Sequence, residues 1–73
     1  MILNISAGTL TINDTTYEAD VTGDNTISFR LSDTDIYVFH YTHDQLIKID
    51  AYDTHGHFQD SIDLDGIDCQ LIY

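Results

Sequence analysis

The sequence predicts an all-β fold: a small antiparallel meander of about six or seven short strands, curled into a barrel or sandwich, with no substantial helix. Runs rich in Ile, Thr, Tyr and Phe are interrupted by Asn, Asp, Gly and Ser about every six to ten residues. No run has apolar residues at helical spacing, and the chain contains no Pro. Because 73 residues can enclose only one small core, residues 1–73 are expected to form a single domain.

A first hairpin is predicted around a two-residue turn at Asn13-Asp14. Pairing Ile12 with Thr15 across this turn gathers the apolar residues of both arms on one face and the polar residues on the other. Residues 2–5 have the opposite apolar parity, and Gly8 lies where the parity changes. We therefore expect one long first strand that is kinked by a bulge at this glycine.

The next two strands are expected at 26–31 and 36–41. Pairing Leu31 with Ile36 would turn Ile36, Val38 and His40 inward. The opposite face would then carry an aromatic stripe, which consists of Tyr37, Phe39 and Tyr41. Pairing Tyr41 with Leu46 across the following turn, which contains Asp44, keeps Ile47, Ile49 and Ala51 inside.

Two turn signals shape the last third of the chain. Residues 53–56 fit a bulged hairpin, which would move the following apolar residues to the side of the aromatic stripe, but also a plain even loop, which would keep them with Ile49. Asp65-Gly66 predicts a type I′ hairpin with Asp63 and Asp68 directly opposite one another. If the sheet closes, the last strand is expected to pair with the first.

The charge is the strongest functional signal. Thirteen acidic residues, twelve of them Asp, face only Arg30 and Lys48, so the formal net charge is -11. Solubility alone needs a net charge with a magnitude of only about 2–8 in a small domain. A larger net charge destabilises the folded state, because the like charges repel one another. A polyphosphate would also be repelled, so we expect no direct binding of nucleic acid by this chain.

Catalytic and metal sites find little support in the sequence. No Ser lies in a nucleophile-elbow context, and Cys69 is in an apolar strand without a basic neighbour, so no enzyme is predicted. The pairs His40/His43 and His55/His57 do not converge in a meander, so no zinc site is expected. Around Gly66, Asp63 and Asp65 match EF-hand ligand positions, but Ile72 stands where the bidentate Glu belongs. We predict no metal and no cofactor, with a calcium-stabilised β module as one alternative.

No apolar run is long enough to span a bilayer, and the first residues lack the basic segment of a signal peptide. We therefore expect a cytoplasmic protein without membrane contact, in the host cell cytoplasm if the chain is phage-encoded.

Rows of short Asp side chains on strands and turns can imitate the phosphates of nucleic acid, because same-face residues on a strand are about 6.5–7 Å apart. In size and charge the chain resembles the acidic inhibitors that phages and mobile elements direct at host nucleases, such as anti-CRISPR and anti-restriction proteins. This resemblance implies an inhibitor that binds the basic surface of a nucleic-acid-binding protein or nuclease. The acidic residues expected to bind are Glu18, Asp20, Asp33, Asp35, Asp63, Asp65 and Asp68.

The aromatic stripe of Tyr37, Phe39 and Tyr41 is expected to supply an apolar contact with the partner or with a second copy in a homodimer. The first alternative to an inhibitor also follows from this stripe. The chain would be a structural or accessory module, such as a small virion or assembly protein, held through the aromatic face and the open sheet edges.

Overall fold

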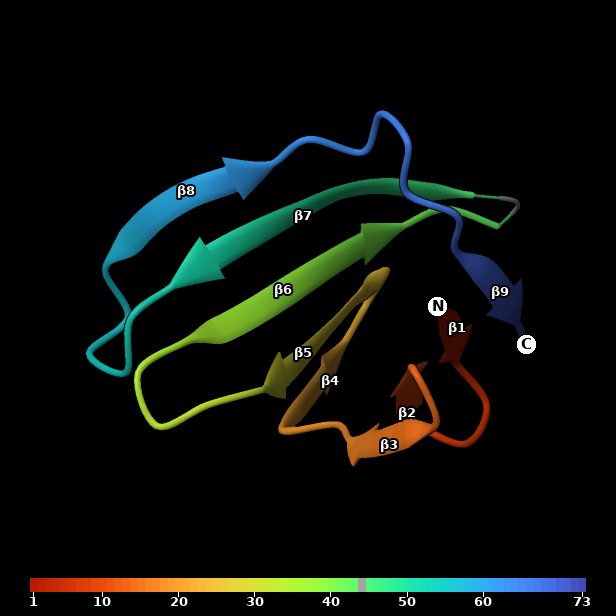
Figure 1. Ribbon diagram of the computed structural model, residues 1–73, viewed down its shortest axis with the longest axis horizontal. Coiled ribbons are helices and arrows are strands. Elements are labelled where there is room, and N and C mark those ends of the chain that lie inside the picture. Colours follow the sequence, from red (N-terminus) through yellow and green to blue (C-terminus); the bar gives the residue numbers. More distant parts are fainter. Residues whose placement is uncertain (44) are drawn as a thin grey trace.

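The computed structural model describes residues 1–43 and 45–73, and within these ranges the chain is all-β, with nine short strands and no helix. The predicted fold class is confirmed, although the strands are shorter and more numerous than the six or seven expected. Two sheets pack against each other as in a sandwich and do not close into a barrel (Figure 1). The predicted turn residue Asp44 lies outside the described residues.

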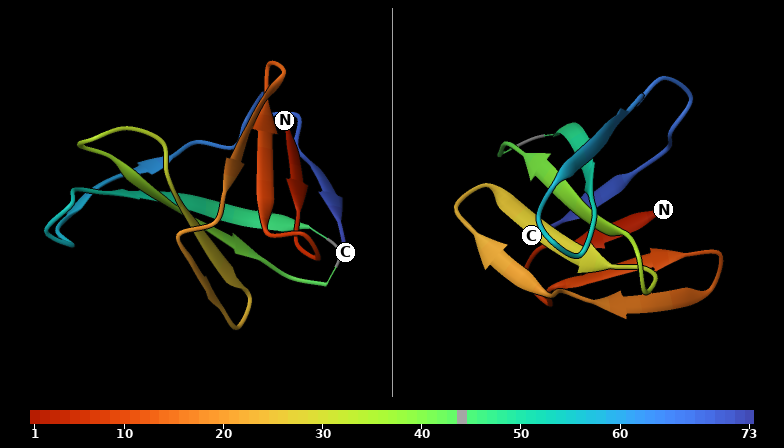
Figure 2. Two further views of the ribbon diagram at one scale, coloured as in Figure 1. Left: turned by 90° about the horizontal axis from the view of Figure 1, so that it is seen from below. Right: turned by 90° about the vertical axis from the view of Figure 1, so that its left-hand side faces the viewer.

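The four-stranded sheet has the order β3-β2-β1-β9, and the five-stranded sheet has the order β4-β5-β6-β7-β8. The first contains β1 (Ile2–Asn4), β2 (Thr9–Ile12), β3 (Thr15–Glu18) and β9 (Gln70–Ile72). The second contains β4 (Val21–Gly23), β5 (Thr26–Arg30), β6 (Ile36–Tyr41), β7 (Leu46–Tyr52) and β8 (Phe58–Ile62). Figure 2 shows that the strands of the two sheets run in different directions.

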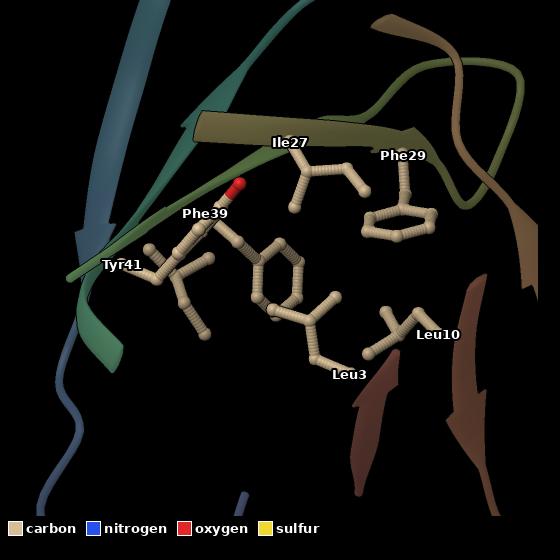
Figure 3. Packing of buried hydrophobic residues seen from close by; sticks show 7 residues of the cluster. Leu3, Leu10, Ile27, Phe29, Phe39 and Tyr41 are labelled. Atoms are coloured by element: carbon tan, nitrogen blue, oxygen red, sulfur yellow. The ribbon is translucent and has the colours of Figure 1, made fainter. Parts of the chain in front are cut away.

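The core lies between the two sheets. Leu3 and Leu10 of the four-stranded sheet are fully buried against Ile27 and Phe29 of the five-stranded sheet, and Phe39 is almost fully buried beside them (Figure 3). The rings of Phe29 and Phe39 meet edge to face, with centroids 5.5 Å apart. This cluster holds the two sheets together, because each sheet has one apolar face to bury.

The hairpin at Asn13-Asp14 forms as predicted, with Ile12 opposite Thr15. Both turn residues have positive φ, 48° and 70°, which is the backbone of a type I′ turn. The prediction of one long kinked first strand is wrong: β1 and β2 are two antiparallel strands, and Gly8 lies in the turn between them at φ 69°. The reversed parity of residues 2–5 therefore marked a turn rather than a bulge.

The predicted pairing of Leu31 with Ile36 is wrong by one residue, because Arg30 is the partner of Ile36. A one-residue slip exchanges the two faces of a strand. The aromatic stripe therefore faces the core, while Ile36, Val38 and His40 face away from it. Both parities of β6 are apolar, so the side-chain pattern could not choose between the two registers.

In β7, Tyr41 pairs with Leu46 as predicted, and Ile49 and Ala51 are buried. The prediction for Ile47 is wrong: it is the extra residue of a bulge and is half exposed. After the loop at 53–57, Ile62 pairs with Ile49 on the core side, whereas Phe58 pairs with Tyr52 on the outer side. The register of β7 and β8 shifts between Ala51 and Tyr52. Because of this shift, Ile62 can face the core while Phe58, on the same short strand, faces outward.

The predicted hairpin at Asp65-Gly66 is wrong beyond its turn. The turn exists, with Ile67 N–H bonded to the Leu64 carbonyl at 3.0 Å and Gly66 at φ 81°. Asp65 is not among the residues with positive φ, so the turn is not the predicted type I′. The chain then crosses to the other sheet, where β9 pairs with β1. The last strand thus meets the first as expected, but in parallel.

Candidate functional site

Most carboxylates of the described residues are at the surface. Asp50 is buried, and Asp35 and Asp53 are partly exposed. The remaining nine acidic residues are exposed: Asp14, Glu18, Asp20, Asp24, Asp33, Asp60, Asp63, Asp65 and Asp68. Six of the seven acidic residues predicted to bind a partner are therefore exposed, and the seventh, Asp35, is partly exposed.

The loop between β5 and β6 presents Asp33 and Asp35. Its shape is set by Ser32, whose Oγ accepts the backbone N–H groups of Thr34 and Asp35 at 3.3 and 3.1 Å. The same hydroxyl donates to Asp35 Oδ2 at 3.1 Å, and Thr34 Oγ1 lies 3.3 Å from that oxygen. The Asp35 carboxylate is thus held in place, while Asp33 is exposed in the same loop.

The loop between β7 and β8 is organised by Asp53. Its Oδ1 accepts the backbone N–H groups of His55 and His57, both at 2.9 Å. Its Oδ2 accepts a hydrogen bond from the Gln59 amide at 3.2 Å and lies 3.4 Å from His57 Nδ1. The backbone N–H of His57 is the main cause that holds the pKa of Asp53 below its ordinary value. Antiparallel pairing puts this loop at the same end of the five-stranded sheet as Asp33 and Asp35 (Figure 1).

The connection between β8 and β9 carries Asp63, Asp65 and Asp68. Asp63 Oδ1 accepts the backbone N–H of Asp65 at 2.9 Å, which makes an Asx turn. Asp63 and Asp68 are not ladder partners, because β8 ends at Ile62. The structure therefore removes the like-charge clash that the predicted hairpin contained, and with it the main reason to place a cation there.

Glu18 and Asp20 lie where the chain passes from one sheet to the other. Glu18 ends β3, and the backbone N–H of Asp20 bonds to the Ser28 carbonyl at 2.8 Å. The predicted acidic residues thus form three separate groups, one at each of three connections. Within residues 1–43 and 45–73, no three His, Cys, Asp or Glu side chains gather as metal ligands.

The aromatic stripe is not a surface feature. Phe39 is 2% exposed and Tyr41 is 8% exposed, and both belong to the core with Ile49, while Tyr37 packs against that cluster. Burial leaves Phe39 and Tyr41 almost no area with which to contact a partner.

Sequence reasoning missed one polar cluster, centred on Asp50 in the middle of the five-stranded sheet. Asp50 is 4% exposed, and Ser61 Oγ donates to its Oδ1 at 2.9 Å. Lys48 Nζ and His40 Nε2 lie 3.4 and 3.1 Å from its Oδ2. His40 Nε2 is close to this oxygen but makes no hydrogen bond among the described residues, so their contact is electrostatic. Only the strand pairing brings these four residues together.

The charges around Asp50 keep it ionised. Burial raises the pKa of Asp50, but the hydrogen bonds from Ser61 and Lys48 and the charges of Lys48 and His40 outweigh burial, so the pKa stays below its ordinary value. Ser61, His40 and Asp50 are not arranged as a catalytic triad, in which the serine hydroxyl bonds to the histidine and the histidine to the acid. Here Ser61 bonds to the Asp50 carboxylate rather than to His40. The cluster is arranged to neutralise a buried charge and not to activate a hydroxyl.

A cavity of about 380 Å³ opens where β9 and the connection before it meet the start of β7. Leu64, Ile67 and Leu71 line it together with Cys69. Burial is the main cause that raises the pKa of the Cys69 thiol, so the thiolate is disfavoured. This environment agrees with Cys69 as a packing residue.

Comparisons with known proteins find no relative: no family model matches the sequence, and neither a curated protein nor a solved structure matches the chain. No helix in the described part of the chain is long and apolar enough to cross a membrane.

Proposed function

We propose that this chain is a small acidic inhibitor that binds the basic surface of a nucleic-acid-binding protein or nuclease and occupies the place of DNA or RNA. In this proposal the exposed carboxylates take the positions of phosphates, and Lys and Arg side chains of the partner bind them. The observation that carries the proposal is the imbalance of exposed charge: nine exposed carboxylates among the described residues against two cations in the chain.

The pairing of Lys48 increases this imbalance. Lys48 is bound to the buried Asp50, so its charge is largely compensated within the sheet. Arg30 is exposed and makes no ion pair with any described residue. The partner therefore meets a surface on which negative charge is almost unopposed, which favours fast, electrostatically steered association.

Several carboxylates are also held in fixed directions. Asp35 is bound by Ser32, and Asp63 is bound by the backbone of Asp65. Fixed carboxylates lose less conformational entropy on binding than mobile ones, which supports a role in recognition. The separation of the acidic groups over three connections suits a broad, channel-like partner surface better than one small pocket.

The test begins with the chain immobilised on beads and incubated with a lysate of its source cells. Proteins eluted by steps of NaCl are then assayed for binding of a labelled DNA duplex and a labelled RNA, with and without added chain. The proposal expects an eluted protein that releases its nucleic acid as the chain is added. It is wrong if every captured protein keeps its nucleic acid while the chain is bound.

Two variants of equal net charge show whether the predicted residues matter. Changing Asp63, Asp65 and Asp68 to Asn keeps the turn, because an Asn side-chain oxygen can accept the same backbone N–H. The matched control carries the same change at Asp14, Asp24 and Asp60, which lie outside the predicted set. We expect the first variant to inhibit several-fold more weakly than the control.

A further inference from the structure

The charges of the chain are strongly segregated by the fold. The outer face of the five-stranded sheet is the side that points away from the core, and alternation along the strands assigns its residues. These are Val21, Thr26, Ser28, Arg30, Ile36, Val38, His40, Lys48, Asp50, Tyr52, Phe58 and Ser61. Both cations of the chain are on this face, and Asp50 is the only one of the twelve described acidic residues there.

The remaining eleven described acidic residues lie in turns and connections, on the core-side parity of β8, or on the four-stranded sheet. With His neutral, Arg30, Lys48 and Asp50 give the outer face a formal charge of +1, in a chain whose total is -11. Asp50 is moreover buried and paired with Lys48. Among the described residues, the outer face thus presents no exposed carboxylate.

The same face carries the most exposed large apolar side chains of the described chain. Val21 on the edge strand β4 is 62% exposed, and Phe58 on the opposite edge strand β8 is 56% exposed. Phe58 rests edge to face on Tyr52, with ring centroids 5.8 Å apart. Exposed apolar side chains therefore lie at both edges of the sheet, and Val38 and Ile36 on β6 between them are partly exposed.

We propose that this outer face is the contact of a symmetric homodimer. Two copies that each carry a charge of -11 repel one another, so they can approach closely only where both surfaces lack exposed carboxylates. A two-fold contact through the outer face meets this condition and directs both sets of carboxylates away from the interface. A contact through any of the acidic connections would place like charges opposite each other.

The size of the molecule limits the area that a dimer contact can bury. The molecule measures 29 × 25 × 22 Å, so even a contact over its largest cross-section, roughly 700 Å², stays somewhat below the 800 Å² or so per partner in a standard interface. We therefore expect a dimer of moderate affinity, with a dissociation constant in the micromolar range. Ions screen the repulsion between the acidic surfaces, so the dimer tightens as salt rises. This is opposite to the salt dependence of binding to a basic partner.

Sedimentation velocity of the full chain tests the proposal, from about 1 μM to 1 mM, at 20 and 500 mM NaCl. The expected result is a monomer–dimer equilibrium whose dissociation constant falls at least about fivefold between the two salt concentrations. A monomer at every concentration and salt overturns the proposal. So does the growth of species larger than a dimer, which indicates head-to-tail contacts between the outer face and the acidic connections.

Charge insertion locates the contact. Val21→Asp and Phe58→Asp each add a carboxylate to an exposed edge of the outer face, and each should raise the dissociation constant about tenfold or more. Ile72→Asp is the control: it adds the same charge on the outward side of the four-stranded sheet, where Ile72 is 38% exposed. Equal weakening by all three variants means that the contact is elsewhere and overturns the proposal. Circular dichroism verifies that each variant is folded, and the inhibition assay tests the proposed function separately from the measurement of the dimer.

Discussion

Asp50 is a buried carboxylate whose loss of hydration is offset by its neighbours. A buried carboxylate is stabilising only when its partners offset the loss of water, and here Ser61, Lys48 and His40 do so. We expect Asp50→Ala to lower the free energy of unfolding by about 1–3 kcal/mol, because it leaves the Ser61 hydroxyl without its acceptor and removes the negative charge beside Lys48 and His40. Urea unfolding measures this change, with Asp24→Ala in an exposed turn as the control. An equal loss in both variants would contradict this account of the cluster.

Asp50 should also make the free energy of unfolding depend on pH in a defined direction. The folded-state pKa of Asp50 is lowered, so the stability it contributes is present above its unfolded-state pKa and is lost as the pH falls through the folded value, below about pH 4. Between pH 6 and pH 3 the wild type should therefore lose more stability than Asp50→Asn, which has no such proton to bind. Parallel acid dependence of the two proteins in urea unfolding would refute the lowered pKa.

At the scale of the element, the register of β6 is the feature with the largest structural consequence. With Arg30 opposite Ile36, Phe39 is buried and Phe58 is exposed. We expect Phe39→Ala to destabilise the fold by about 3–5 kcal/mol and Phe58→Ala by less than about 1 kcal/mol, because only the first leaves a cavity in the core. Thermal unfolding compares the two variants directly. A larger loss for Phe58→Ala would favour the register in which the aromatic stripe faces outward.

The two-residue turns offer a second comparison. Asp14 has φ 70°, where glycine is free of strain, whereas Asp24 is not among the residues with positive φ. Asp14→Gly should raise stability by a few tenths to about 1 kcal/mol, and Asp24→Gly should lower it by a similar amount. Both variants remove one carboxylate, so charge alone predicts equal shifts in melting temperature. Equal shifts would mean that repulsion, and not turn conformation, dominates at these positions.

Local sequence patterns were sufficient to predict some turns and strand pairings but not others. The turn at Asn13-Asp14 was predictable with its register, because only one register separates apolar from polar residues. The turn at Asp65-Gly66 was also predictable, but the partner of the following strand was not, since β9 meets β1 from the far end of the chain. The cluster around Asp50 could not be foreseen, because it depends on pairings of β7 with both β6 and β8. A buried Asp and an exposed Asp look alike in sequence.

Over the whole molecule, the fold places the exposed carboxylates and the two cations on different parts of the surface. The connections and turns carry exposed carboxylates, while the outer face of the five-stranded sheet carries both cations and the half-exposed Phe58. A dimer through that face would join two acidic surfaces into one longer body without bringing their carboxylates together. Such a body would present carboxylates to a partner over a greater length of a nucleic-acid channel than one copy can.

The salt dependence of binding to the captured nucleic-acid-binding protein shows whether the exposed carboxylates take the place of phosphates. The affinity is measured by titration between 50 and 300 mM NaCl, on wild type and on the variant with Asn at 63, 65 and 68. We expect the logarithm of the affinity to fall linearly with the logarithm of the salt concentration, and the variant to have a shallower slope because fewer charges are neutralised. An affinity that does not change with salt, or an equal slope for both proteins together with a complex that still holds its nucleic acid, would contradict the proposed imitation of nucleic acid.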